Sequence, residues 1–185
     1  CAEYADKGAV SCVGINDVDA AQSVISHLVE KGYRRIALIN HDLSYKYARL
    51  RERGYKAALH ALSLEYQAVE YASELSSSAG IAAMKTLLAA EVKPDAVFAV
   101  SDTLAAGAMR AIFNAGLQIP QDIAVVGFDG TELAEMVSPQ LSTIEQPSRD
   151  IGRKAVGLLL NKIENPDAQT ERVMMDWRYI SRAST

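Results

Sequence analysis

Cysteine and histidine are scarce in this chain of 185 residues, which contains two cysteines and three histidines. Two cysteines are too few for a disulfide framework or a zinc site, and this usage is typical of a reducing cytoplasm. His27, His41 and His60 fall in different segments, which argues against a metal-binding cluster. We therefore expect no metal, no cofactor and a cytoplasmic location, although a chain that begins at Cys1 is also compatible with a lipidated mature protein.

Long apolar runs and an excess of positive charge are also absent. The longest apolar runs, such as residues 123–126, have the length of a strand, whereas a membrane-spanning helix needs about 20 apolar residues. The net charge is −4, and acidic residues are interleaved with basic pairs such as Arg34 and Arg35. A domain that binds DNA usually presents a basic face. We expect no membrane partner and no DNA binding by this chain alone.

Sequence motifs of catalysis are missing as well. The chain has no G-x-S-x-G elbow, no P-loop, no dinucleotide-binding fingerprint and no H-E-x-x-H pair. An enzyme acting on a bound sugar would also need an acid and a base in reach of each other, and no such pair is evident. We expect that the chain is not an enzyme.

Short apolar runs alternate with amphipathic stretches of helical length. Strands are expected at residues 10–15, 35–40, 67–71, 96–100 and 123–128, and helices at 17–31, 48–62, 76–90 and 102–115. The strands are too apolar to face water, so this alternation predicts an α/β fold with a doubly wound parallel sheet. The pattern changes after Asp129, where a turn at 131–137 and a strand at 141–144 precede a helix at 147–164. A closing strand is expected at 172–180.

Polar side chains follow three of the predicted strands. Ligands of open parallel sheets bind beyond the carboxyl ends of the strands, where such side chains converge. The set provides carboxylates, a guanidinium, hydroxyls and aromatic rings, which suits a ligand with a polyhydroxylated ring. Its members are His41, Asp42, Ser44, Tyr45, Tyr47, Arg51, Ser101, Asp102 and Asp129.

Each of these residues also has a purely structural interpretation. Asp102 precedes an apolar helix and is a favourable helix N-cap. Asp129 is followed by Gly130, which is a common turn pair. Arg51 can be a surface residue, and Tyr45 and Tyr47 can pack their own loop. The prediction of a binding site rests on three strand ends being polar together.

Several segments resemble the LacI/GalR family of bacterial transcription regulators. They are SDTLAAGAMR at 101–110, GLQIPQDIAVVGFD at 116–129, PQLSTIEQP at 139–147 with the following Ile151 and Gly152, HLVEKGYRRI at 27–36 and RERGY at 51–55. The resemblance implies a core of periplasmic-binding-protein-like type I, with two lobes and an effector between them. It further implies a homodimer that binds operator DNA through a helix-turn-helix absent from this chain.

The resemblance also implies roles for individual residues. It places a sugar or a nucleoside or purine effector against Arg51, Asp129, Tyr45, Tyr47, Ser101 and Gln146. The chain departs from the family pattern in two places: Leu75 stands where several members have a pocket aromatic, and the Asn16-Asp17 order is reversed. These departures concern the identity of the effector.

The resemblance further suggests an interface and a division into lobes. Met109, Ile112 and Met136 match dimer-interface elements, with packing inside the lobe as the alternative. Residues 1–15 are expected to be a remnant of the N-terminal lobe, 16–141 the C-terminal lobe, 142–165 a crossover with a helix of the N-terminal lobe, and 166–185 the closing strand of the C-terminal lobe. The C-terminal lobe would then be nearly complete and the N-terminal lobe mostly missing.

Two functions remain open at this point. The leading one is the effector-sensing core of a transcription repressor, in which the bound effector changes operator affinity. The alternative is a periplasmic sugar-binding protein of a transport system, because such proteins share the two-lobed fold. The residues upstream of Cys1 distinguish them, since a helix-turn-helix indicates a repressor and a signal peptide indicates transport.

Overall fold

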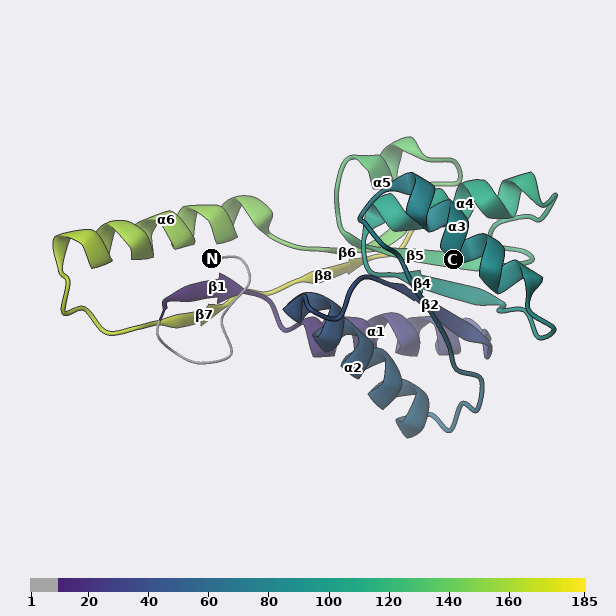
Figure 1. The fold of residues 1–185 in the computed structure, drawn as a ribbon, viewed down its shortest axis with the longest axis horizontal. Coiled ribbons are helices and arrows are strands. Elements are labelled where there is room, and N and C mark those ends of the chain that lie inside the picture. The colour runs from purple at the N-terminus through teal and green to yellow at the C-terminus, as the bar shows by residue number, and fades with distance from the viewer. Residues whose placement is uncertain (1–9) are drawn as a thin grey trace. The chain divides into compact units, whose positions relative to one another are not determined.

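The computed structural model describes residues 10–185 and divides the chain into two compact units (Figure 1). Unit 1 is formed by the residues up to Asn16 together with Gln146–Trp177. Unit 2 is formed by Asp17–Glu145 together with Arg178–Thr185. Cys1 lies outside the described residues. Within residues 10–185, no helix combines the length and the apolar character that crossing a membrane requires.

Unit 2 is built on a six-stranded sheet with the order β3-β2-β4-β5-β6-β8. Every residue of β2 and β4 is buried, as expected for strands that are covered on both faces. The first five strands run parallel and β8 pairs antiparallel to β6, which confirms the predicted parallel sheet. The strands are β2 (Ile36–Asn40), β3 (Ala68–Tyr71), β4 (Ala96–Ala99), β5 (Ala124–Asp129), β6 (Ser142–Glu145) and β8 (Arg178–Ile180).

Two pairs of helices cover this sheet, one pair on each face (Figure 1). The helix α1 packs against α2, and α3 packs against α4. Each of these four helices lies within two residues of its predicted bounds, because apolar residues on one face of each helix define it in the sequence. The helices are α1 (Asp17–Glu30), α2 (Lys46–Ala61), α3 (Ser77–Ala89), α4 (Asp102–Asn114) and the short α5 (Leu133–Met136).

The N-terminal caps of α3 and α4 are both serines. Ser76 Oγ accepts a hydrogen bond from Ala79 N at 3.1 Å, in agreement with the sequence pattern. At α4 the N-cap is Ser101, whose Oγ accepts from Leu104 N at 3.2 Å. The interpretation of Asp102 as this cap is therefore wrong, because Ser101 has the extended backbone of a cap and Asp102 already belongs to the helix.

Unit 1 consists of a two-stranded parallel sheet, β1 (Cys12–Gly14) with β7 (Arg172–Met174), and the helix α6 (Ser148–Glu164). Only Ile151 and Leu158 of α6 are buried. Four further apolar side chains of this helix are more than half exposed: Val156, Leu159, Leu160 and Ile163. The apolar side chains of α6 are therefore largely uncovered among the described residues.

The end of the chain differs from the expected single closing strand at 172–180. The structure has two short strands there, of which β7 pairs with β1 in unit 1 and β8 pairs with β6 in unit 2. The break falls where the chain changes its pairing partner. Residues 166–177 thus belong to unit 1, whereas β6, which was assigned to the crossover, belongs to unit 2.

The close approach of α3 and α4 depends on glycine. A Cβ atom at Gly107 would overlap the carbonyl oxygen of Ser77 and lie 3.0 Å from Cα of Gly80. We expect Gly107→Ala to lower the free energy of unfolding by about 1–3 kcal/mol through overpacking, measured by urea unfolding of the full-length protein. The control is Gly157→Ala in α6, where no atom lies within 4 Å and alanine should favour the helix. Equal stability of the Gly107→Ala variant and the wild type would contradict this packing.

Candidate functional site

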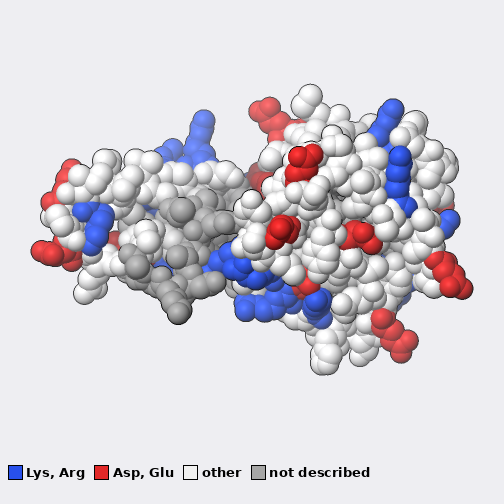
Figure 2. Space-filling model, in the orientation of Figure 1, with Lys and Arg blue, Asp and Glu red and all other residues white. Residues whose placement is uncertain are grey.

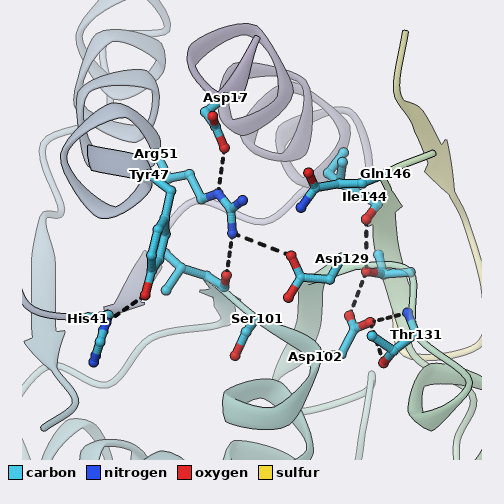
Figure 3. Close-up of polar contacts among 12 residues, drawn as sticks. Asp17, His41, Tyr47, Arg51, Ser101, Asp102, Asp129, Thr131, Ile144 and Gln146 are labelled. Atoms are coloured by element: carbon cyan, nitrogen blue, oxygen red, sulfur yellow. Dashed lines mark hydrogen bonds and ion pairs between the residues drawn. The ribbon is translucent and has the colours of Figure 1, made fainter. Parts of the chain in front are cut away.

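The carboxyl ends of the neighbouring strands β2, β4 and β5 bring a cluster of polar and aromatic side chains together (Figure 3). Tyr47 and Arg51 come from α2, which follows β2, and Asp129 is the last residue of β5. The Arg51 guanidinium carbon lies 5.0 Å from the Tyr47 ring centroid, and its Nη1 lies 3.7 Å from Asp129 Oδ1. The convergence expected from the three strand ends is therefore present.

Arg51 is the centre of this cluster and is held on three sides. Its Nε donates to Asp17 Oδ1 at 2.8 Å, and its Nη1 donates to the Val100 carbonyl oxygen at 2.6 Å. The guanidinium also lies over the Phe128 ring, 3.5 Å from the centroid. Only 6% of the side chain is exposed, so the interpretation of Arg51 as a surface residue is wrong.

Asp17 is the residue of this cluster that the sequence analysis did not include. It is the first residue of α1 and its side chain is only 10% exposed. The reversed Asn16-Asp17 order was the one signal at this position, but nothing in the sequence connects it with Arg51, 34 residues away. A buried guanidinium requires an opposite charge within contact, and Asp17 provides it.

Asp129 holds its carboxylate at the cluster through an uncommon backbone conformation. Its φ is +110°, which side-chain-bearing residues rarely adopt, and Gly130 follows with a φ of +69°. Asp129 is the last residue of β5, so the turn interpretation of this pair holds only in that the strand ends here. The side chain is 35% exposed, and strained backbone of this kind clusters at binding sites.

Asp102 secures the chain that follows Asp129. Its Oδ2 accepts from Thr131 N at 2.7 Å and from Thr131 Oγ1 at 2.9 Å, and its Oδ1 accepts from Thr143 Oγ1 at 2.6 Å. Burial raises the pKa of Asp102 above its ordinary value, while these three hydrogen bonds favour the carboxylate. Asp102 thus joins the start of α4 to β6 and to the loop after β5.

The aromatic part of the cluster consists of His41, Tyr45 and Tyr47. His41 Nδ1 and the Tyr47 hydroxyl are 2.6 Å apart, within hydrogen-bond distance. The Tyr45 ring is stacked on His41 with centroids 4.7 Å apart, and it is 45% exposed. Tyr45 and Tyr47 therefore do pack within their own loop, as in the structural interpretation. Part of the Tyr45 side chain nevertheless stays exposed.

Ser101 and Gln146 differ from the other expected ligand-binding residues. Ser101 is 4% exposed, and its hydroxyl serves as the N-cap of α4. Gln146 belongs to unit 1, where it begins the segment that leads into α6. Four of the six expected ligand-binding residues therefore belong to the cluster in unit 2. They are Arg51, Asp129, Tyr45 and Tyr47.

The residues expected at a dimer interface divide into two kinds. Ile112 is fully buried and Met109 is 5% exposed, so both pack inside unit 2, as the alternative interpretation had it. Met136 is 79% exposed, and Phe113, which the sequence analysis omitted, is 69% exposed. A surface hollow of about 830 Å³ is lined by apolar groups that include Met109, Phe113, Leu117, Val137 and Pro139.

The side chains of the cluster are of the kinds that contact polar ligands. Among residues 10–185, no group of three histidine, cysteine, aspartate or glutamate side chains could hold a metal ion. The cluster offers a planar guanidinium donor, a carboxylate acceptor and aromatic surface, which together suit a ligand rich in hydroxyl groups. Fold and site together define the class: a ligand-binding α/β domain of the periplasmic-binding-protein-like type.

Comparison with known proteins agrees with this class and narrows it. A family model for the periplasmic binding protein-like domain matches residues 25–185. The Ribose operon repressor of Escherichia coli is 38% identical over 159 residues, which cover 85% of this chain and 48% of the repressor. The repressor CytR of the same species is 33% identical over 184 residues, which cover 99% of this chain and 54% of the repressor. The chain belongs to the LacI/GalR family of transcription regulators, as its motifs suggested.

Solved structures support the same assignment. The transcriptional regulator CelR in complex with cellobiose is 32% identical with a TM-score of 0.91, over 96% of this chain and 55% of CelR. A LacI family regulator from Enterococcus faecium with bound ribose is 28% identical with a TM-score of 0.91, over 99% of this chain and 68% of that regulator. The chain spans about half the length of the curated relatives it matches.

The hydrogen bonds of Asp102 should contribute measurably to stability. Asp102→Ala removes an acceptor from three donors, and we expect the free energy of unfolding to fall by about 1–3 kcal/mol. Urea unfolding of the full-length protein measures the effect, with Thr103→Ala at the next helical position as the control. Unchanged stability of the Asp102→Ala variant would show that this carboxylate does not secure the loop after β5.

Proposed function

We propose that this chain is the effector-sensing core of a transcription repressor and that its effector is a small sugar. The observation that carries the proposal is the pairing of a rigid Arg51 with a partly exposed Asp129 at the strand ends of unit 2. The family supplies the regulatory context, because curated relatives over most of the chain are repressors. Operator binding would then use a helix-turn-helix outside this chain.

Relatives with known ligands support a sugar as the effector. Regulators with bound ribose and with bound cellobiose share the fold, and the Ribose operon repressor is among the curated relatives. Ribose is therefore the first ligand to test, with nucleosides as the second class. The same relatives favour a regulator over the alternative of a transport-linked sugar-binding protein. A regulator of this kind acts in the cytoplasm and catalyses no reaction, and we extend both properties to this protein.

Asp129 provides the most direct test of the sugar site. If its carboxylate accepts two hydrogen bonds from sugar hydroxyls, each contributes about 1.5–3 kcal/mol. Asp129→Ala should then weaken D-ribose affinity by about two to four decades, since about 1.4 kcal/mol corresponds to a factor of ten. Calorimetric titration of the folded full-length protein measures this change.

The control for this titration is Glu132→Ala, which removes an exposed carboxylate three residues further along the chain. We expect its affinity for ribose to equal that of the wild type. An Asp129→Ala variant that is folded and binds ribose as tightly as the wild type would remove Asp129 from the site. In that case the residue would only shape its turn.

We also propose that the full-length protein is a homodimer that uses the surface around α4 and α5 of unit 2. The support is the exposure of Phe113, which lines the hollow, and of Met136, which is next in the chain to the lining residue Val137, because exposed apolar side chains of this kind often mark an interface. Unit 1 would similarly be part of a larger N-terminal lobe. The exposed apolar side chains of α6 are the surface that the rest of that lobe would cover.

Met136→Asp should shift the dimer toward monomer without loss of stability, because this side chain is 79% exposed. Sedimentation velocity at micromolar concentration measures the shift. Met109→Asp should instead lower the free energy of unfolding, because Met109 is buried. The matched control is Val92→Asp, an exposed apolar position elsewhere on unit 2. A wild type that sediments as a monomer would contradict the dimer.

A further inference from the structure

Two carboxylates contact the Arg51 guanidinium in unit 2, and they hold it unequally (Figure 3). Asp17 Oδ1 lies 2.8 Å from Nε, and the Asp17 side chain is 10% exposed. Asp129 Oδ1 lies 3.7 Å from Nη1, and the Asp129 side chain is 35% exposed. The first distance is that of a charge-assisted hydrogen bond and the second is that of a loose ion pair. Asp17 therefore neutralises the charge of Arg51, while the carboxylate of Asp129 lies at the more exposed side of the guanidinium.

The hydrogen bond from Arg51 to Asp17 helps to fix the orientation of the guanidinium. Nε is bonded to Asp17, Nη1 is bonded to the Val100 carbonyl oxygen, and the plane of the group lies over Phe128. Among residues 10–185, no group accepts a hydrogen bond from Nη2 of Arg51. With Nε and Nη1 engaged and one face of the group covered by Phe128, Nη2 keeps its two N–H donors for a ligand.

Without Asp17, Arg51 would have a different partner. Asp129 is the other carboxylate in contact with the guanidinium, so the pair would close on itself. Both groups that we assign to sugar hydroxyls would then be occupied by each other. With Asp17 present, the contact between Arg51 and Asp129 stays a loose ion pair, because Asp17 already meets the charge requirement of the buried arginine.

The same contact sets the net charge of the cluster. One guanidinium faces the carboxylates of Asp17 and Asp129, and the nearby Asp102 adds a third carboxyl group. His41 lies on the other side of Tyr47. A neutral hydroxyl can accept from Nη2 and donate to Asp129, whereas a phosphate or carboxylate group would meet an excess of negative charge. Like charges at such distances in a buried site are strongly unfavourable.

We propose that Asp17 is the positioning and specificity-determining residue of this site, which holds Arg51 ready for the ligand and makes unit 2 select neutral sugar hydroxyls over phosphorylated or acidic sugars. This inference rests on the proposed function, because it assigns the ligand class of the same site. The competing explanation is that Asp17 only stabilises the N-terminus of α1, where acidic residues favour the helix dipole.

Three variants of the full-length protein separate these explanations. Asp17→Asn keeps an oxygen that can accept from Arg51 Nε but removes the charge. Asp17→Ala removes both the charge and the acceptor. Asp19→Asn removes a charge from the same turn of α1 at an exposed position, so it serves as the matched control for the helix dipole.

The first measurement needs no ligand and follows the NMR signal of the Arg51 Nε–H group. We expect one sharp, slowly exchanging signal in the wild type, in Asp19→Asn and in Asp17→Asn, and its loss in Asp17→Ala. A signal that persists unchanged in Asp17→Ala would overturn the positioning role. This result does not depend on which sugar binds, so it separates the inference from the proposed function.

The second measurement compares titrations with D-ribose and with D-ribose 5-phosphate. The wild type and Asp19→Asn should bind ribose and reject the phosphate ester. Asp17→Asn should lower the preference for ribose at least tenfold, which corresponds to about 1.4 kcal/mol. Asp17→Ala should bind ribose about tenfold more weakly or worse, because Arg51 and Asp129 close on each other.

Three results would overturn the specificity role. One is an unchanged preference for ribose over its phosphate ester in Asp17→Asn. Another is an equal change in Asp19→Asn, which would point to the helix dipole. The third is a wild type that binds neither compound, which would overturn the proposed sugar site as well, while the Nε–H signal would still decide the positioning role.

Discussion

The burial of one positive charge is the constraint on which unit 2 depends. The Arg51 guanidinium sits in the interior of the fold, where an uncompensated charge would be prohibitively unfavourable. Its compensation comes from three other elements: Asp17 at the start of α1, the Val100 carbonyl after β4 and the Phe128 ring of β5. These elements must therefore keep their relative positions around α2 for the arginine to be stable, and the ligand-binding arrangement follows from that requirement.

A second set of contacts builds the accessible side of the same site. Asp102 joins α4 to Thr131 and to β6, so the chain that follows the strained backbone of Asp129 is fixed to two other elements. Gly130 is necessary there, because a Cβ atom would lie 2.6 Å from Cα of Glu145. Arg51 and Asp129 are thus presented as a preformed donor and acceptor, which reduces the conformational entropy that a ligand must remove on binding.

Local sequence patterns predicted much of this structure. The features that depend on contacts between residues far apart in the chain could not be predicted. The helices, the parallel sheet and the convergence of Tyr47, Arg51 and Asp129 follow from periodicity and from the polarity of strand ends. The role of Asp17 could not be predicted, because its partner is 34 residues away and comes close only when α1 packs against α2. The division of the last strand into β7 and β8 depends on partners that are equally distant in the chain.

Two predictions were wrong by a single residue, and their cause is not long-range pairing. Ser101 and Asp102 are both good helix caps, and only the backbone conformation shows where α4 begins. Ile112 and Phe113 are neighbours whose side chains point about 100° apart on a helix, so the face that the sheet covers decides which one is exposed. Sequence alone does not determine that face for a helix that is apolar over much of its surface.

In the proposed site, one sugar bridges the guanidinium of Arg51 and the carboxylate of Asp129. The decisive measurement is a crystal structure of the full-length protein with D-ribose. We expect ribose hydroxyls within about 3.2 Å of Arg51 Nη2 and of Asp129, with the bond between Asp17 and Arg51 retained. Ribose bound elsewhere, or bound at this site with neither residue in hydrogen-bond contact, would show that the two residues do not form the sugar site.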